Sequence, residues 1–317
     1  PAMARIEPMP MMALRAAPME PMARSSVPIN PNETNRANLE RWKRALESVT
    51  KPNKEIFFEE APYHFCSHRN NLFVALKSDK VYVYETTSTN YFEEVNLVDI
   101  KVPSIVAIAC NANYLAVAYC TGKDKLKVGD KKLKGNGVVL FARDGPKVIT
   151  QIDKVIDREF VKPKGLAMND DYLFDSDFEQ HAVFKFDIQR WAQVQELKFP
   201  KDEQPYKISV NQSYAAVTEM TNHTVNIYDV GNFALRHKQK VESSIKRPSS
   251  DKSGPFDIYL TSDNILLTKT NWQSTIALLD INLNKQFEFD IDKSVMMTSF
   301  AMIEFHANPI LAIGCYD

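Results

Sequence analysis

The chain has 317 residues, 44% of them hydrophobic, and its 39 Lys and Arg nearly balance 40 Asp and Glu. That length suits two average domains or one large all-β domain, no stretch reaches the roughly 18 apolar residues of a membrane span, and no secretory signal is visible at the start. Four scattered cysteines argue against a disulfide scaffold and against a Cys-x-x-Cys zinc site. We therefore expect a cytoplasmic protein that does not associate with membranes.

Residues 1–32 are rich in Pro, Met and Ala and show no sustained hydrophobic period. This composition predicts a disordered lead. Residues 33–50 are expected to form an N-terminal helix, because Leu39, Trp42 and Leu46 recur at helical spacing and a proline follows the pattern.

From Glu55 onward, short apolar stretches alternate with turn residues. These stretches are rich in Val, Ile, Tyr and Phe, and no long helical pattern interrupts them. Such a texture is typical of an all-β fold.

A repeat organises this region. Residues 163–187 and 205–230 share a proline, an inner strand, a polar turn, a second strand and a third strand ending in an aromatic residue and Asp, at an offset of 42 residues. Periods of about 40–50 residues are typical of β-propellers, whose sheets stack because one sheet alone cannot bury both its faces. Six repeats begin at Pro62, Pro103, Pro163, Pro205, Pro255 and Ser299. We expect residues 55–317 to form a six-bladed β-propeller, preceded by the short N-terminal helix.

The ring is one strand short. Six four-stranded blades need 24 strands, and the sequence shows 23 from Glu55 onward, counting Glu55–Glu60 as a strand that returns beside the last blade. Three explanations stay open: residues 1–30 supply the missing outer strand, the last blade has three strands, or the natural chain continues beyond Asp317. Closure matters because an open edge invites pairing with other chains.

The repeat resembles that of the NHL-repeat family, most closely in its third and fourth copies. One copy is matched by Pro163, Gly165, Leu166, Ala167, Asp175, His181, Val183, Phe186 and Asp187, and the next by Pro205, Asn222, His223, Val225, Tyr228 and Asp229. The resemblance implies a six-bladed propeller like those of TRIM-NHL proteins and Brat-like translational repressors. Some of these propellers bind single-stranded RNA on one face, and others dock proteins there.

Basic residues gather in loops expected on that face. The segment 121–137 has six lysines against two aspartates, and the loops leading into the third and fifth repeats are also basic. Aromatic, histidine and asparagine side chains lie among these loops. The candidate binding residues are Lys123, Lys125, Lys127, Lys131, Lys132, Lys134, Arg158, Lys162, Lys164, Lys246, Arg247, Lys252, Tyr63, Phe178, His181, Asn222, His223 and Trp272.

We interpret the protein as a non-catalytic scaffold or adaptor that binds a protein or peptide partner on this face. An alternative is single-stranded RNA binding in post-transcriptional regulation, in which Lys and Arg pair with phosphates and bases stack on exposed rings. The sequence leaves open the partner and the oligomeric state.

A second alternative is a metal-dependent hydrolase or lyase propeller. His181 and His223 are 42 residues apart at the same place in adjacent repeats, so both could face the axis as metal ligands. However, no nucleophile elbow, phosphate loop or dinucleotide motif is present. The aspartates near strand ends are interpreted as turn caps: Asp175, Asp177, Asp187, Asp229 and Asp280. We therefore expect no catalytic residue, no cofactor and no metal.

Overall fold

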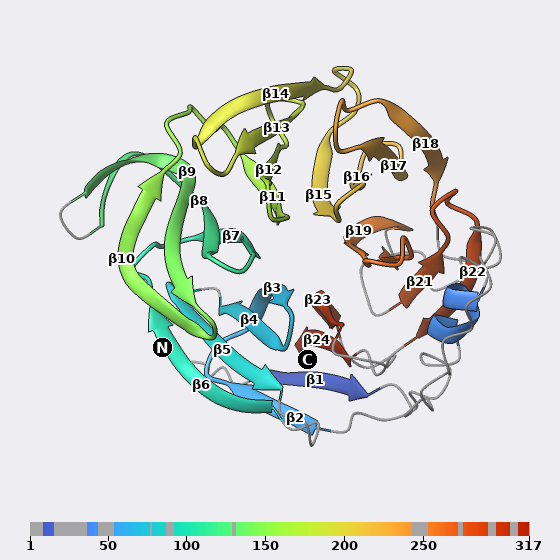
Figure 1. Cartoon of the computed structure of the whole chain (residues 1–317), viewed down its shortest axis with the longest axis horizontal. Coiled ribbons are helices and arrows are strands. Elements are labelled where there is room, and N and C mark those ends of the chain that lie inside the picture. The colour runs from blue at the N-terminus through green and yellow to red at the C-terminus, as the bar shows by residue number, and fades with distance from the viewer. Residues whose placement is uncertain are drawn as a thin grey trace, which may run out of the picture.

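The computed structural model describes residues 9–15, 37–43, 54–76, 78–86, 92–128, 131–242, 253–271, 275–290, 296–304 and 310–316. These residues form six four-stranded antiparallel sheets and one short helix, over residues 37–43. The sheets are arranged around a central axis as a β-propeller (Figure 1). The all-β prediction is therefore confirmed.

Five sheets are each built from four consecutive strands. The first contains β3 (Pro62–His68), β4 (Asn71–Leu76), β5 (Lys80–Thr86) and β6 (Phe92–Asp99). The second contains β7 (Ile105–Cys110), β8 (Tyr114–Val128), β9 (Lys131–Asp144) and β10 (Lys147–Val155). The third contains β11 (Pro163–Met168), β12 (Tyr172–Asp177), β13 (Ala182–Asp187) and β14 (Ala192–Lys198). The fourth contains β15 (Pro205–Val210), β16 (Tyr214–Glu219), β17 (Thr224–Asp229) and β18 (Leu235–Lys240). The fifth contains β19 (Ser253–Leu260), β20 (Leu266–Asn271), β21 (Thr275–Leu279) and β22 (Lys285–Asp290).

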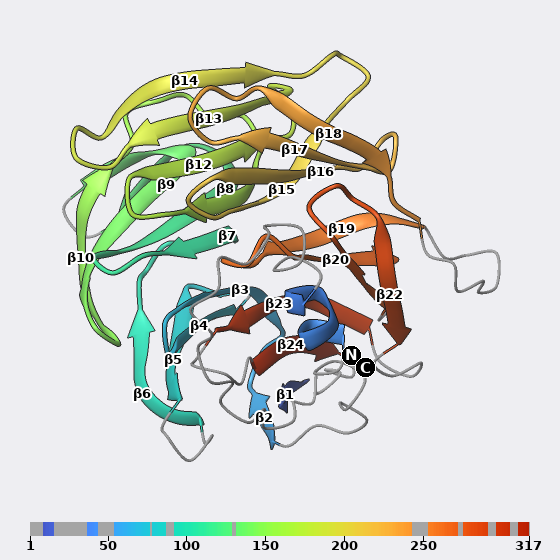
Figure 2. The same ribbon diagram turned by 45° about the vertical axis from the view of Figure 1, so that its right-hand side comes forward.

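The remaining sheet joins the two ends of the chain. Its order is β2 (Lys54–Phe58), β1 (Met9–Arg15), β24 (Ile310–Tyr316) and β23 (Met296–Ile303). Figure 2 shows β1 and β2 beside β24, so that strands from the N-terminal and C-terminal parts of the chain share one sheet. The prediction of a disordered lead is thus wrong for residues 9–15; of the three explanations for the missing strand, the structure supports the one in which residues 1–30 supply it. The rest of residues 1–32 lies outside the described residues. Composition did not reveal this strand, because β1 pairs with β2 and β24 through backbone groups that every residue possesses and needs no particular side chains.

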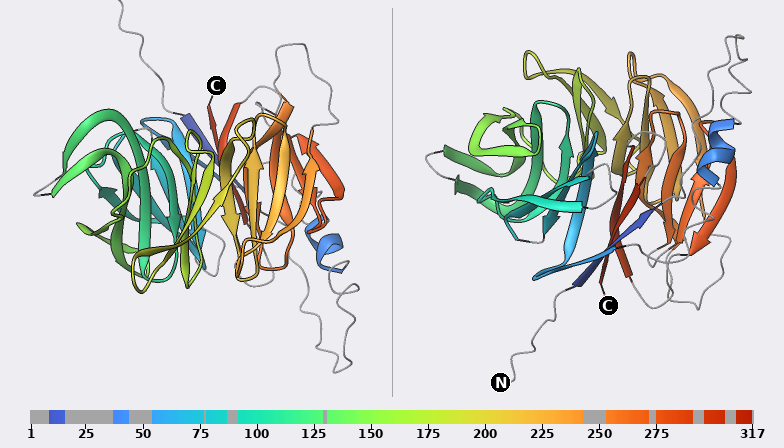
Figure 3. Two further views of the ribbon diagram at one scale, coloured as in Figure 1. Left: turned by 90° about the horizontal axis from the view of Figure 1, so that it is seen from above. Right: turned by 60° about the horizontal axis from the view of Figure 1, so that its bottom comes forward.

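The first strand of each consecutive sheet lies nearest the axis. β3, β7, β11, β15 and β19 contact one another in that order, and β23 contacts both β19 and β3. Figure 3 shows the sheets from two further directions. Because each sheet packs against a neighbour on both faces, its middle strands are buried throughout, as in β4, whereas outer strands such as β14 are largely exposed.

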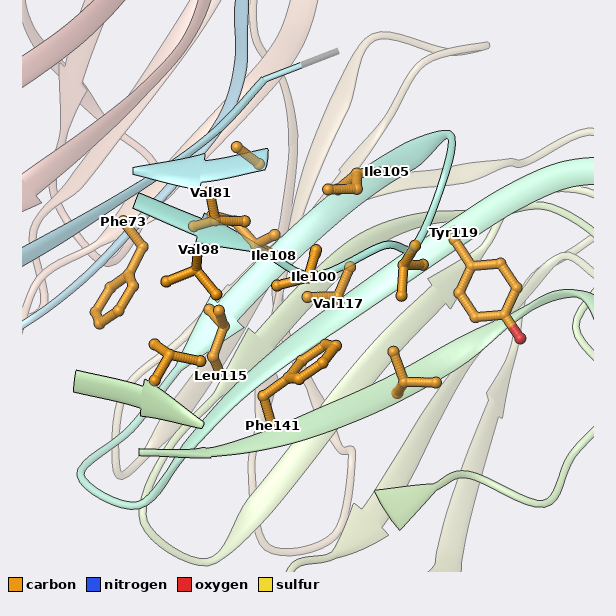
Figure 4. Packing of buried hydrophobic residues seen from close by; sticks show 14 of the residues in the cluster. Phe73, Val81, Val98, Ile100, Ile105, Ile108, Leu115, Val117, Tyr119 and Phe141 are labelled. Atoms are coloured by element: carbon orange, nitrogen blue, oxygen red, sulfur yellow. The ribbon is translucent and has the colours of Figure 1, made fainter. Parts of the chain in front are cut away.

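The core fills the seams between neighbouring sheets. Figure 4 shows the seam between the first two sheets, where Phe73 and Val81 approach Leu115, Val117 and Phe141. Each such seam is an apolar cluster drawn from two sheets. The stacked sheets therefore bury apolar surface that a single sheet would leave exposed.

The N-terminal helix is described only over residues 37–43, and the rest of the predicted 33–50 lies outside the described residues. Its Trp42 is 1% exposed and packs in the cluster formed by β20, β21, β23 and β24. The indole Nε1 donates to Asp263 Oδ2 at 3.4 Å. In the described part of the chain, no helix has the length and apolar content needed to cross a bilayer.

The lysine-rich segment 121–137 was predicted to be a loop. In the structure most of it belongs instead to a long hairpin. β8 and β9 continue to pair beyond the rest of their sheet, with Lys125 opposite Lys134 and Lys127 opposite Lys132. The buried Val128 and Leu133 join the core cluster of the first two sheets. The apolar residues of this segment, Leu126, Val128 and Leu133, were too few among its lysines to indicate strands.

Candidate functional site

The inner strands enclose a cavity of about 130 Å³ on the axis, lined by residues of all six sheets. A register shift near the start of each inner strand turns one equivalent residue toward this cavity. Five of these residues line it: His64, Ala107, Lys207, Asp257 and Ser299. The sixth is Gly165, where a Cβ would lie 2.8 Å from the carbonyl oxygen of Tyr206, so only glycine lets β11 and β15 approach this closely.

Lys207 is the central cation of the axial cavity. Its Nζ lies 3.4 Å from His64 Nδ1 and 3.4 Å from the carbonyl oxygen of Val106. Burial lowers the pKa of Lys207 to about 8; the Asp257 carboxylate opposes this shift and the Lys164 ammonium adds to it. Burial also holds the pKa of His64 well below its usual value, and the charges of Lys207 and Lys164 lower it further. His64 is therefore neutral at pH 7.

Asp257 is the acidic group of the same cavity, and the protein already satisfies it. Its Oδ2 accepts from Ser299 Oγ at 2.7 Å and from the backbone N–H of Phe300 at 3.2 Å. The Nζ of Lys269, whose pKa burial lowers to about 8, donates to the carbonyl oxygen of Met297. The cavity thus contains a carboxylate, Asp257, that already accepts hydrogen bonds, and a cation, Lys207, whose contacts are long.

We call the side formed by the loops entering the inner strands and by the turns between second and third strands the loop face. The two kinds of loop meet there: Asp177 accepts from the backbone N–H groups of Val161 at 2.7 Å and Lys162 at 3.0 Å. Beside them, the ring of Phe178 packs edge-on against Tyr206 at 6.3 Å between centroids. Aromatic side chains and Lys164 therefore gather where the axial cavity approaches the loop face.

We call the opposite side, formed by the turns between first and second strands, the turn face. It holds a second hollow of about 340 Å³, which shares six wall residues with the axial cavity. Its rim is a chain of asparagines in which Asn111 Nδ2 donates to the carbonyl oxygen of Asn169, and Asn169 Nδ2 to that of Asn211, both at 3.1 Å. The pattern Asn-x-x-Tyr recurs in three successive repeats, and this recurrence could have revealed that asparagine side chains link neighbouring sheets by hydrogen bonds.

Some of the predicted binding residues converge, and others do not. Lys164, Tyr63 and Phe178 lie near the axis on the loop face, and the Tyr63 ring is 6.1 Å from that of His64. Lys162 instead pairs with Glu179 at 2.8 Å. The hairpin exposes Lys127, Lys132 and Lys134. The remaining predicted groups lie outside the described side chains: Lys123, Lys125, Lys131, Lys246, Arg247, Lys252 and Trp272.

Arg158 was predicted as a free basic group and is instead part of the fold. Its guanidinium lies 3.4 Å from the centroid of the Phe184 ring and donates to Gln180 Oε1 at 3.2 Å and to Gln193 Oε1. The cation–π contact and the two amides hold it against the third sheet. Its charge is therefore not presented to a partner as sequence reasoning expected.

His181 and His223 do not face the axis. Both lie in the turn between the second and third strands, with φ of 51° and 58°, a left-handed conformation that histidine tolerates. The Nδ1 of His181 lies 2.8 Å from the carbonyl oxygen of Glu203, and that of His223 lies 3.7 Å from Glu242 Oε1. Asn222, beside His223, is exposed. In the described residues, no group of three His, Cys, Asp or Glu side chains is placed to hold a metal ion.

Four of the five aspartates interpreted as turn caps are caps. Backbone N–H groups donate to the carboxylates of Asp177, Asp187, Asp229 and Asp280. Asp175 is the exception: it is fully buried, and neither oxygen has a hydrogen-bond partner among the described residues. Burial, reinforced by the charge of Asp177, raises its pKa well above the usual value, while Arg158 opposes the shift. Equivalent strands carry Val117 and Val217 at this position.

Asp175→Val should therefore raise the free energy of unfolding at pH 7 by about 1–3 kcal/mol, because it removes a buried carboxyl without partners. Asp177→Val is the matched control and should lower it by at least about 2 kcal/mol, since it frees several backbone donors. The folded-state pKa of Asp175 lies above its unfolded value, so wild-type stability falls as pH rises through that interval. The advantage of Asp175→Val should thus be larger at pH 7 than at pH 4 in urea denaturation. An Asp175→Val protein less stable than wild type at pH 7 would contradict this account.

The cavity residues Lys207, Asp257 and Ser299 were not predicted. A signal was present, because His64, Lys207 and Asp257 each stand two residues after the proline that opens a repeat. Aligning the repeats would have exposed a polar column in otherwise apolar inner strands. That these residues line one cavity, however, follows only from the arrangement of the sheets around the axis.

Comparison with known proteins leaves the fold and the axial cavity as the observations that bear on function. No protein-family model matches the chain, and no curated protein is significantly similar to it.

Proposed function

We propose that the protein is a non-catalytic recognition platform that binds a protein or peptide partner on its loop face, around the mouth of the axial cavity. Such a ring presents its binding groups already ordered, so association loses little conformational entropy. The groups available are a cation, a carboxylate, hydroxyls and aromatic rings within one small area. That mixture suits a folded-protein loop or an extended peptide.

One observation favours a protein or peptide partner over a nucleic acid. Among the predicted basic residues in and just before the first strand of the third sheet, Arg158 and Lys162 are engaged by the fold, whereas Lys164 lies near Lys207 at the axis. A nucleic acid strand needs lysines and arginines along several successive phosphates. Two lysines close together beside aromatic rings suit a single acidic group of a peptide segment better than they suit a row of phosphates.

Site-specific photo-crosslinking tests this proposal. A photoreactive phenylalanine analogue replaces Tyr63 on the loop face or, as the control, Gln212 on the turn face. We expect a discrete, saturable crosslinked partner from position 63 that is lost when Lys164→Glu is added, and none from position 212. Equal crosslinking from both faces, or none from position 63, would refute a loop-face platform.

Single-stranded RNA binding is the second candidate, favoured by the exposed Lys127, Lys132 and Lys134 on the β8–β9 hairpin. Fluorescence anisotropy with short single-stranded RNAs at two salt concentrations separates the two. An RNA site would bind at micromolar concentration or better, and its affinity would fall with log salt at a slope of about 0.7 per phosphate contacted. Charge reversal of Lys132 and Lys134 would weaken that binding for every sequence.

We also propose that all six sheets serve as blades of one closed ring and that the chain is related to NHL-repeat propellers. Support comes from the recurrence of the same three-strand pattern in β11–β13 and β15–β17 at the 42-residue offset. Four free cysteines suit a compartment that keeps thiols reduced, such as the cytoplasm: Cys66, Cys110, Cys120 and Cys315.

A further inference from the structure

Lys207 carries a charge that the described residues satisfy weakly. Its ammonium has three donors, but its contacts to His64 and to the carbonyl of Val106 are both 3.4 Å long, beyond the 2.7–3.2 Å of a good hydrogen bond. No ion pair in the described part of the chain involves Lys207. Asp257, the carboxylate of the same cavity, is already held by Ser299 and Phe300.

The surroundings of Lys207 favour a negative occupant. His64 Nδ1 lies 3.4 Å from the Lys207 ammonium, and the neutral imidazole brings no negative charge to the cavity. Lys164 adds a second positive charge close enough to affect both groups. The charged or polar groups that face Lys207 come from every inner strand around it: His64 on β3, the carbonyl of Val106 on β7, Lys164 on β11, Tyr206 on β15, Asp257 on β19 and Ser299 on β23.

We propose that the axial cavity binds a small oxyanion, a carboxylate or a phosphate group, with Lys207 as its main ligand and with His64 and Lys164 beside it. The cavity volume of about 130 Å³ exceeds what one water molecule needs and admits a group of several heavy atoms. The inference goes beyond the proposed function, because a free oxyanion would occupy the cavity without any partner protein.

The protonation of Lys207 gives the site a pH dependence. Its pKa of about 8 lies below the usual value for lysine, so the ammonium is charged at pH 7 and mostly neutral at pH 9.5. Oxyanion binding should therefore weaken between these pH values. In the absence of ligand, the same shift means that the charge on Lys207 opposes folding below about pH 8, and stability should recover as pH rises from there toward 10.5.

Isothermal titration calorimetry at constant ionic strength tests the site. The titrants are inorganic phosphate, succinate, and a blocked Gly-Gly-Glu-Gly-Gly peptide with its Gln counterpart as the neutral control. We expect saturable binding of at least one oxyanion at pH 7 that is at least fivefold weaker at pH 9.5. Lys207→Met should weaken it at least tenfold, whereas Lys198→Met, on the exposed edge strand β14, should stay within twofold of wild type.

The outcomes separate the sources of the oxyanion. Binding of phosphate or succinate assigns the cavity to a free anion, and binding of the Glu peptide alone assigns it to an acidic side chain of a partner. Thermal unfolding of Lys207→Met should occur at or above the wild-type temperature, which shows that any loss of binding is not loss of fold. No saturable binding of any of the three oxyanions, or wild-type affinity in Lys207→Met, would overturn the proposal, and neither result bears on crosslinking at position 63.

Discussion

Removal of residues 1–15 is expected to lower the free energy of unfolding by about 3 kcal/mol or more, whereas removal of residues 1–8 should change it little. β1 pairs five residues with β2 and five with β24, so its loss breaks two backbone ladders at once. Each backbone hydrogen bond contributes about 1 kcal/mol net. The melting temperature measured by circular dichroism should fall by roughly 6–10 °C for the longer truncation.

The exposed edge of β24 gives this truncation a second signature. An unpaired strand edge offers N–H and C=O groups to other chains, so the protein lacking residues 1–15 should aggregate in size-exclusion chromatography. A synthetic peptide of residues 9–15, added in trans, should partly restore the monomer by adding itself as a strand. Identical melting temperatures for the two truncations would show that β1 does not close the sheet.

Trp42→Ala is expected to destabilise the protein by about 3–5 kcal/mol, the usual effect of removing a buried tryptophan. The indole is 1% exposed among residues of the fifth sheet and the sheet that joins the chain ends, and its Nε1 reaches Asp263. Trp42→Phe keeps most of the packing and loses only the long hydrogen bond, so it should be destabilised far less. Guanidinium unfolding followed by circular dichroism measures both variants.

The outcome for Trp42 decides how the helix contributes. If Trp42→Ala and Trp42→Phe are both as stable as wild type, the helix over residues 37–43 is only attached to the propeller. A large loss for alanine and a small one for phenylalanine means that the helix is part of the core that fills the seam between the fifth sheet and the sheet that joins the chain ends. Since that seam lies between β20–β21 and β23–β24, its loss would also loosen the axial cavity, to which β19 and β23 contribute Asp257 and Ser299.

If the axial cavity binds an oxyanion as proposed, a protein with almost no net charge recognises charge locally. The formal net charge of −1 conceals a local excess of positive charge at Lys207 and Lys164. Interactions in such a partly desolvated site are stronger than those of solvated surface lysines. Recognition would then depend on a few groups at the axis, and not on the number of lysines in exposed segments.

Most of the strands, and their order along the chain, could be predicted from the sequence. Alternation of apolar and polar residues marked the strands, the 42-residue repeat predicted a propeller, and the caps at Asp177, Asp187, Asp229 and Asp280 followed from local turn chemistry. These features depend on residues close together in the chain, and such local preferences can be recognised without knowing what lies across the fold.

The pairing of the N-terminal strand with the last strands, and the groups at the axis, depend on the tertiary structure. β1 meets β24 across 295 residues of chain, from Arg15 to Ile310, through backbone groups that every residue possesses, so no residue pattern predicts the pairing. His64, Lys207 and Asp257 come from three different sheets, and only the register shifts of their strands turn these residues toward one cavity. Asp175 is buried without hydrogen-bond partners, and burial lowers the pKa of Lys207. Both effects depend on every neighbour packed around the group, which the sequence near that group does not specify.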